Sequence, residues 1–190
     1  MPSDTGTTAP SEEKRDQQRA LLTGLMRELM QSEWSAVRHP RREASHFGAA
    51  PPAQALRAVA DHAEKNIGEL RAVARRHDLP IGRVAVAVGA AMSALRHTIV
   101  DRMIERERSY RATLLGMRHG IDLVKLIRRI ADDGGMVELA GFCTHWLEAR
   151  EPLVERVESA MSWFASHPHR AAEVPRRRRW RPWRRAAAAS

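Results

Sequence analysis

The chain has 190 residues, one cysteine and a formal net charge of +9, and 43% of its residues are hydrophobic while only 5% are aromatic. This length is enough for one domain with a sizeable core, and the lone cysteine, Cys143, excludes an internal disulfide. Neither a signal peptide nor an apolar run of membrane-spanning length is recognisable, so we expect a soluble cytoplasmic protein.

Apolar residues recur at helical spacing along most of the chain, and no run alternates apolar and polar residues as a strand would, which predicts an all-α protein. A first helix is predicted from Ser11, whose hydroxyl can cap it, to about Pro40. Residues 41–50 are expected to form a connector. A second helix is predicted to begin at Pro51 and to end near His77.

The longest periodic stretch, Pro80 to Asp133, is either one very long helix or two helices joined by a tight turn. A straight helix of this length would span roughly 75 Å, more than a domain of this size covers, which favours a bend or turn between Arg102 and Arg108. In its second half, apolar residues lie on two sides of the helix, which predicts packing between neighbours. One side consists of Tyr110, Leu114, Met117, Ile121 and Val124, and the other of Leu115, Leu123, Leu126 and Ile130.

A last helix is predicted from Met136 to Phe164, with one apolar seam that advances by alternating steps of four and three residues. Its members are Met136, Ala140, Cys143, Leu147, Arg150, Val154, Val157, Met161 and Phe164. Pro152 falls inside this seam without changing its phase, which indicates a kink rather than a break. Because Cys143 lies on the seam, we expect a small buried hydrophobe and not a nucleophile.

Together these elements predict an up-and-down helical bundle of about four to five helices over residues 11–168. Residues 1–10 are polar and expected to be disordered, and residues 169–190 form an Arg/Trp-rich tail.

Histidines and carboxylates at helical spacing raise the question of a metal site. The order His-x-x-acid occurs twice, as His119-x-x-Asp122 and His145-x-x-Glu148. His145 lies about 200° around the helix from the buried seam and should face solvent. His119 falls on the stripe of Leu115 and should be partly buried.

The bundle over about residues 52–166 resembles the ferritin-like proteins, in which inward carboxylates and Glu-x-x-His pairs bind two metal ions. This chain has only the reverse order, so the resemblance is architectural. It implies iron or another divalent metal as cofactor, with Glu107, His119, His62 and Glu69 as candidate ligands. The alternative for Glu107 is an ion pair in the Arg/Glu-rich turn, and for His119 a hydrogen bond to a neighbour. A metal site requires the four side chains to converge.

The tail carries seven arginines and no acid after Pro175, and without these charges the rest of the chain has a net charge of only +2. We predict a polyanion-binding segment made of Arg176, Arg177, Arg178, Arg179, Trp180, Arg181, Trp183, Arg184 and Arg185. Arginine supplies bidentate phosphate contacts, and tryptophan stacks on bases or settles at a membrane interface. Nucleic acid, an anionic membrane and an acidic protein all remain open as partners, as does a solvated tail without a dedicated partner.

The sequence contains no glycine-rich phosphate loop, Cys-x-x-Cys, His-Glu-x-x-His or Gly-x-Ser-x-Gly motif, so we assign no catalytic residue. The leading hypothesis is a non-enzymatic interaction or scaffold protein without a cofactor. It would form a homo-oligomer or bind a protein partner, and its tail would contact a polyanion. The alternatives are a ferritin-like protein for metal binding or storage, and a bundle that holds a small apolar ligand between its helices.

Overall fold

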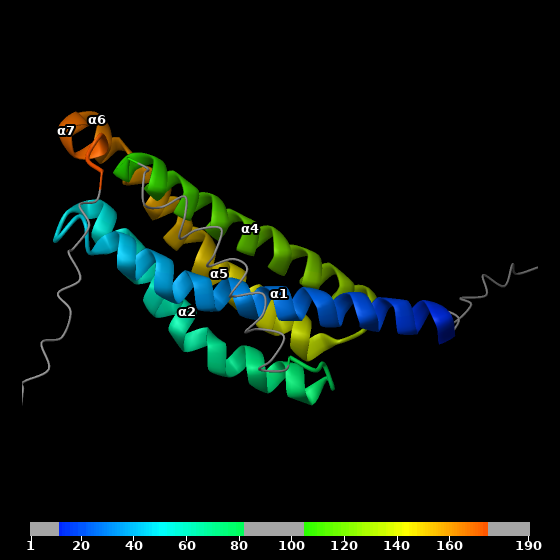
Figure 1. Cartoon of the computed structure of the whole chain (residues 1–190). Coiled ribbons are helices and arrows are strands. Elements are labelled where there is room, and N and C mark those ends of the chain that lie inside the picture. Colours follow the sequence, from blue (N-terminus) through cyan, green and yellow to red (C-terminus); the bar gives the residue numbers. More distant parts are fainter. Residues whose placement is uncertain (1–11, 82–104, 175–190) are drawn as a thin grey trace, which may run out of the picture.

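The computed structural model of the chain describes residues 12–81 and 105–174, which are helical with short connections and contain no strand (Figure 1). This confirms the all-α prediction. The helices are α1 (Glu12–Ala44), α2 (Pro51–Arg76), α4 (Arg106–Asp133), α5 (Val137–Ser159), α6 (Ser162–Ser166) and α7 (Pro168–Ala171). The expected cap at Ser11, the first half of the central stretch and the Arg/Trp segment lie outside the described residues.

The four long helices form a bundle in which α1 packs on α2 and α4, and α5 packs on the same two helices. Neighbouring helices run antiparallel (Figure 1). Each contributes an apolar stripe to one continuous core, which runs from Leu22 and Met26 on α1 to Leu139 and Val157 on α5. The predicted helical bundle is therefore confirmed.

Helix α1 does not end at Pro40, as the sequence suggested, but continues for one more turn to Ala44. Proline removes a backbone donor and usually ends or kinks a helix. Here tertiary contacts hold the last turn, because Ala44 is fully buried and Arg41 forms ion pairs with Asp61 and Glu64 of α2.

Glu105 has an extended backbone (φ −54°, ψ 146°), and α4 begins at the next residue. The chain is therefore not one continuous helix from Pro80 to Asp133, and the break falls inside the expected interval from Arg102 to Arg108. Helix α2 ends at one end of the bundle and α4 begins at the other (Figure 1).

The prediction that α4 is covered on two sides is wrong for two of its leucines. Leu115 is 69% exposed and Leu126 is 47% exposed, whereas Leu123 is buried. Helix α4 packs against α1, α5 and, at its start, α7, and these contacts leave Leu115 and Leu126 exposed. Leu123 is buried because it lies about 80° around the helix from Leu115, nearer to the packed side of α4.

Helix α5 ends at Ser159, earlier than the predicted Phe164. A turn at Ala160 and Met161 redirects the chain into α6, which brings Phe164 against Phe47 and Tyr110 with ring centroids 5.5 and 5.3 Å away. These aromatic contacts explain the early end. The helix runs through Pro152 without a break, as predicted.

Candidate functional site

The structure does not bring the four predicted metal ligands together. Glu107 pairs with Arg111 one turn along the same helix, and Nε2 of His119 lies 2.9 Å from Oε1 of Glu28 on α1, in an exposed hydrogen bond. Glu69 is exposed on α2, and His62 points into the bundle. No cluster of three or more His, Cys, Asp or Glu side chains suited to a metal ion occurs within residues 12–81 and 105–174. The donor set does not fit a shared metal ion.

The core holds a buried ion pair between Glu33 of α1 and Arg150 of α5. Their exposures are only 1% and 2%. Nη2 of Arg150 donates to both carboxylate oxygens of Glu33, at 3.0 and 2.8 Å. The pair joins two helices that lie diagonally across the bundle (Figure 1).

Helix α2 completes this network with His62 and Asn66. Nε of Arg150 donates to Nδ1 of His62 at 2.9 Å, and the side-chain amide of Asn66 lies 2.9 Å from the ring Nε2. Because Nδ1 accepts a hydrogen bond, the ring is neutral in this arrangement. Burial, then Arg150, then Lys65 lower the pKa of His62 to about 4.

Trp146 lines the network on the α5 side, with its ring 4.6 Å from the guanidinium of Arg150. Burial raises the pKa of Glu33 and lowers that of Arg150, while their attraction opposes both shifts. The indole N–H of Trp146 is close enough to favour the carboxylate but makes no hydrogen bond of standard geometry. Through these contacts the network links α1, α2 and α5.

At the other polar centre, Arg106 ties the end of the described chain to the bundle. Its backbone N–H donates to the carbonyl of Glu173 at 3.1 Å, and its Nη2 donates to the Glu173 carboxylate at 2.9 Å. Nη1 donates to the carbonyl of His46, at 2.8 Å. Arg170 adds a second ion pair to Glu173. The chain is thus fastened three residues before Arg176 begins the Arg/Trp segment.

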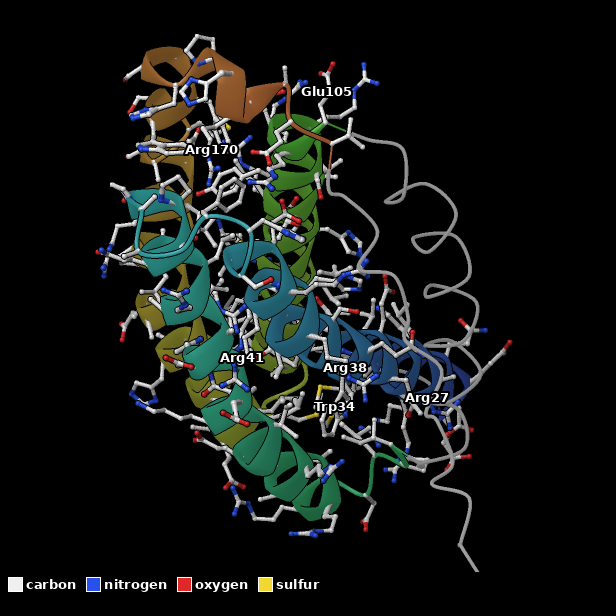
Figure 2. All side chains as sticks on the ribbon, turned by 60° about the vertical axis from the view of Figure 1, so that its left-hand side comes forward. Arg27, Trp34, Arg38, Arg41, Glu105 and Arg170 are labelled. Carbon is white, nitrogen blue, oxygen red and sulfur yellow. The ribbon has the colours of Figure 1, made fainter. Side chains whose placement is uncertain are left out.

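The surface between α1 and α2 carries a cationic aromatic patch. The guanidinium groups of Arg38 and Arg71 lie 5.8 and 5.5 Å from the ring of Trp34. Figure 2 shows Trp34 and Arg38 together on α1. Neither arginine forms an ion pair within the described ranges, whereas Arg41, about one turn beyond Arg38, is neutralised by carboxylates of α2.

Cys143 is buried and free, and burial raises the pKa of its thiol to about 12, so it behaves as a small hydrophobe, as predicted. No described helix is both long and apolar enough to cross a bilayer.

The sequence itself contains a signal for the Glu33–Arg150 pair, which the predicted site residues do not include. Glu33 stands in phase with Met26, Leu29 and Val37, and Arg150 is the one charge on the seam of the last helix. One acid and one base on apolar stripes of one bundle indicate a buried pair.

Comparisons with models of protein families, with curated proteins and with solved structures find no match for this chain. Fold and site together define an all-α bundle with a buried Glu33–Arg150 ion pair, a cationic patch around the half-buried Trp34 and a chain end attached through Glu173.

Proposed function

We propose that this protein is a non-enzymatic interaction module, a self-associating helical bundle that presents the Arg/Trp segment 176–185 to a polyanion. The observation that carries this proposal is the attachment of Glu173 to Arg106. It fixes the position of Glu173, three residues before an acid-free run of seven arginines and two tryptophans begins in the sequence.

The chemistry of that segment suits phosphate-rich partners. Guanidinium groups bind phosphate in bidentate fashion, and tryptophan rings between them stack on bases or insert at a lipid interface. The patch around Trp34 supports the same function, because Arg38 and Arg71 add positive charge that no described carboxylate cancels.

The experiment compares the full chain with a truncation after Val174, which keeps the Glu173 attachment. Binding to single-stranded DNA, duplex DNA, RNA and vesicles with about one third anionic lipid is measured across a salt series. If about six or seven phosphates are neutralised, log K for the full chain falls steeply with log salt, with a slope near −5 on nucleic acid, and the truncation loses most of the affinity.

Two variants separate charge from stacking. Replacing Trp180 and Trp183 by alanine keeps the charge and lowers affinity for single strands more than for duplexes if the rings stack on bases. Replacing the seven arginines by glutamine removes most of the salt dependence and leaves only the part that Arg38 and Arg71 contribute. Equal binding of the full chain and the truncation on every partner would overturn the role of the segment.

A further inference from the structure

The uncovered side of α4 carries a regular seam. Its residues are spaced alternately by four and three, which is the average period of 3.5 that helices use when they pack along one another. All of them are exposed. They are Arg108, Ala112, Leu115, His119, Asp122, Leu126, Arg129 and Asp133.

This seam is complementary to itself when it is reversed. Turning the helix end over end about a point between His119 and Asp122 places Leu115 opposite Leu126, and His119 opposite Asp122. The same operation places Arg108 opposite Asp133 at the two ends. Ala112 then faces Arg129, so a small side chain lies opposite a long one.

From this pattern we infer that a second copy of the chain docks on α4 in antiparallel orientation, related by a twofold axis near the middle of the helix. A twofold contact uses the same surface on both subunits, so each complementary pair occurs twice. The contact covers both copies of Leu115 and Leu126, the two exposed leucines of α4. This inference deepens the self-association part of the proposed function and is independent of the polyanion part.

The charges along α4 favour this arrangement. Arg108 and Asp122 form no ion pair among the salt bridges of the described chain. Their proposed partners Asp133 and His119 contact Arg129 and Glu28 of their own chain through exposed side chains, and docking exchanges these contacts for intermolecular ones. On the edge of the seam that faces α5, Arg118 and Lys125 are neutralised by Glu158 and Glu151 of their own chain. In the dimer, the Arg118 and Lys125 side chains of the two copies therefore come close without strong repulsion.

The first test measures mass in solution by sedimentation equilibrium of the full chain over a concentration series. The expected mass approaches twice 21.4 kDa. Replacing both Leu115 and Leu126 by aspartate weakens association at least about tenfold, because apolar contact is replaced by facing like charges. The matched control is Val137→Asp, which adds a charge at an 81% exposed apolar residue of α5 and leaves the mass unchanged.

The second test concerns orientation. Arg108→Asp and Asp133→Arg each place like charges opposite one another twice and weaken association by about threefold or more. The double variant restores opposite charges and recovers the wild-type constant. A double variant as weak as the sum of the singles would contradict the antiparallel register.

The third test is disulfide formation. Leu115 and Leu126 are separated by about 16 Å along the helix, whereas disulfides need Cα atoms within about 7 Å. Leu115→Cys alone and Leu126→Cys alone should therefore give little crosslinking, while a mixture of the two gives a covalent dimer. The native Cys143 is buried and should not form an intermolecular disulfide.

Each opposite outcome overturns the inference. These are a wild-type chain that is monomeric throughout the series, a mixture that crosslinks no better than its components, and a Leu115→Asp variant that unfolds the monomer. The last result would place another part of the same chain on this face. Circular dichroism of every variant confirms that the bundle has folded.

Discussion

Glu33 and Arg150 place two opposite charges in a core that is otherwise built mainly from apolar side chains. Removing each charge from water costs several kcal/mol, and only close pairing, with further hydrogen bonds to the remaining donors and acceptors, offsets that cost. The pair therefore adds little net stability as a whole, while the loss of one member leaves an uncompensated buried charge. Its geometric role is to fix the relative position of α1 and α5.

Arg150→Met should lower the free energy of unfolding by about 3–5 kcal/mol, because the Glu33 carboxylate is left buried without its partner. The double variant Glu33→Leu with Arg150→Met removes both charges and should recover most of this loss. Urea unfolding followed by circular dichroism measures both. If the double variant is as unstable as the single one, the loss comes from packing around Arg150 and not from the stranded charge.

The lowered pKa of His62, about 4 in the folded chain, makes stability depend on pH. The unfolded histidine takes up a proton near its ordinary pKa of about 6.5, whereas the folded one stays neutral. As pH falls from about 6.5 to 4, the unfolded state binds more protons and stability declines by about 1–3 kcal/mol, becoming constant for this group below pH 4.

The control for this dependence is His62→Gln, which keeps an acceptor for Arg150 but does not titrate. Urea midpoints between pH 7 and 4.5 should fall less steeply in the variant than in the wild type. Parallel curves would show that His62 does not contribute.

A helix end can be predicted from the sequence when local contacts determine it, and not when contacts with distant residues do. Pro51 starts α2 and Gly134 follows the end of α4, and both boundaries were predicted because local backbone chemistry sets them. The ends of α1 and α5 were misplaced because distant contacts decide them. Asp61 and Glu64 stabilise the turn after Pro40 through ion pairs with Arg41. The ring contact between Phe47 and Phe164 favours the turn that ends α5 before Phe164.

The same distinction applies to the sites. Periodicity placed Cys143 in the core correctly, but it placed His119 on a buried stripe that the structure leaves exposed. A stripe of leucines is apolar whether the helix buries it against its own chain or presents it to another. The pattern of α4 therefore could not show whether this stripe packs within the chain or on a second molecule.

The ion pairs of Glu173 attach the end of the described chain to α4, and a single substitution can weaken this attachment. Glu173→Gln weakens the ion pairs to Arg106 and Arg170 and should raise amide hydrogen exchange in residues 162–174 severalfold. Global stability should change by no more than about 1 kcal/mol, because these contacts lie at one end of the bundle. Hydrogen exchange with mass spectrometry resolves the two effects.

The matched control is Glu155→Gln, an exposed carboxylate of α5 that makes no ion pair in the described structure. Its exchange pattern should match the wild type. Unchanged exchange in Glu173→Gln would show that the backbone bond from Arg106 to Glu173 holds the segment without the carboxylate.

For the whole molecule, the two proposals combine into one quantitative expectation. A twofold dimer carries two Arg/Trp segments, each following in sequence the Glu173 that Arg106 holds. A polyanion long enough to reach both segments meets the second at a high effective concentration once the first is bound. Affinity for a long polyanion should then exceed affinity for a short one by more than the number of sites explains.

The variant with Leu115 and Leu126 replaced by aspartate tests this coupling, because both positions lie on α4 and outside the Arg/Trp segment. On a short oligonucleotide of about ten residues it should bind as the wild type does, since one segment saturates that length. On a long polyanion it should lose about tenfold to a hundredfold in affinity, because the second segment is no longer attached to the first. Fluorescence anisotropy with both lengths at one salt concentration measures the two effects. Equal losses on both lengths would mean that α4 contacts the polyanion directly. No loss on either, with dimerisation abolished, would mean that each segment binds independently.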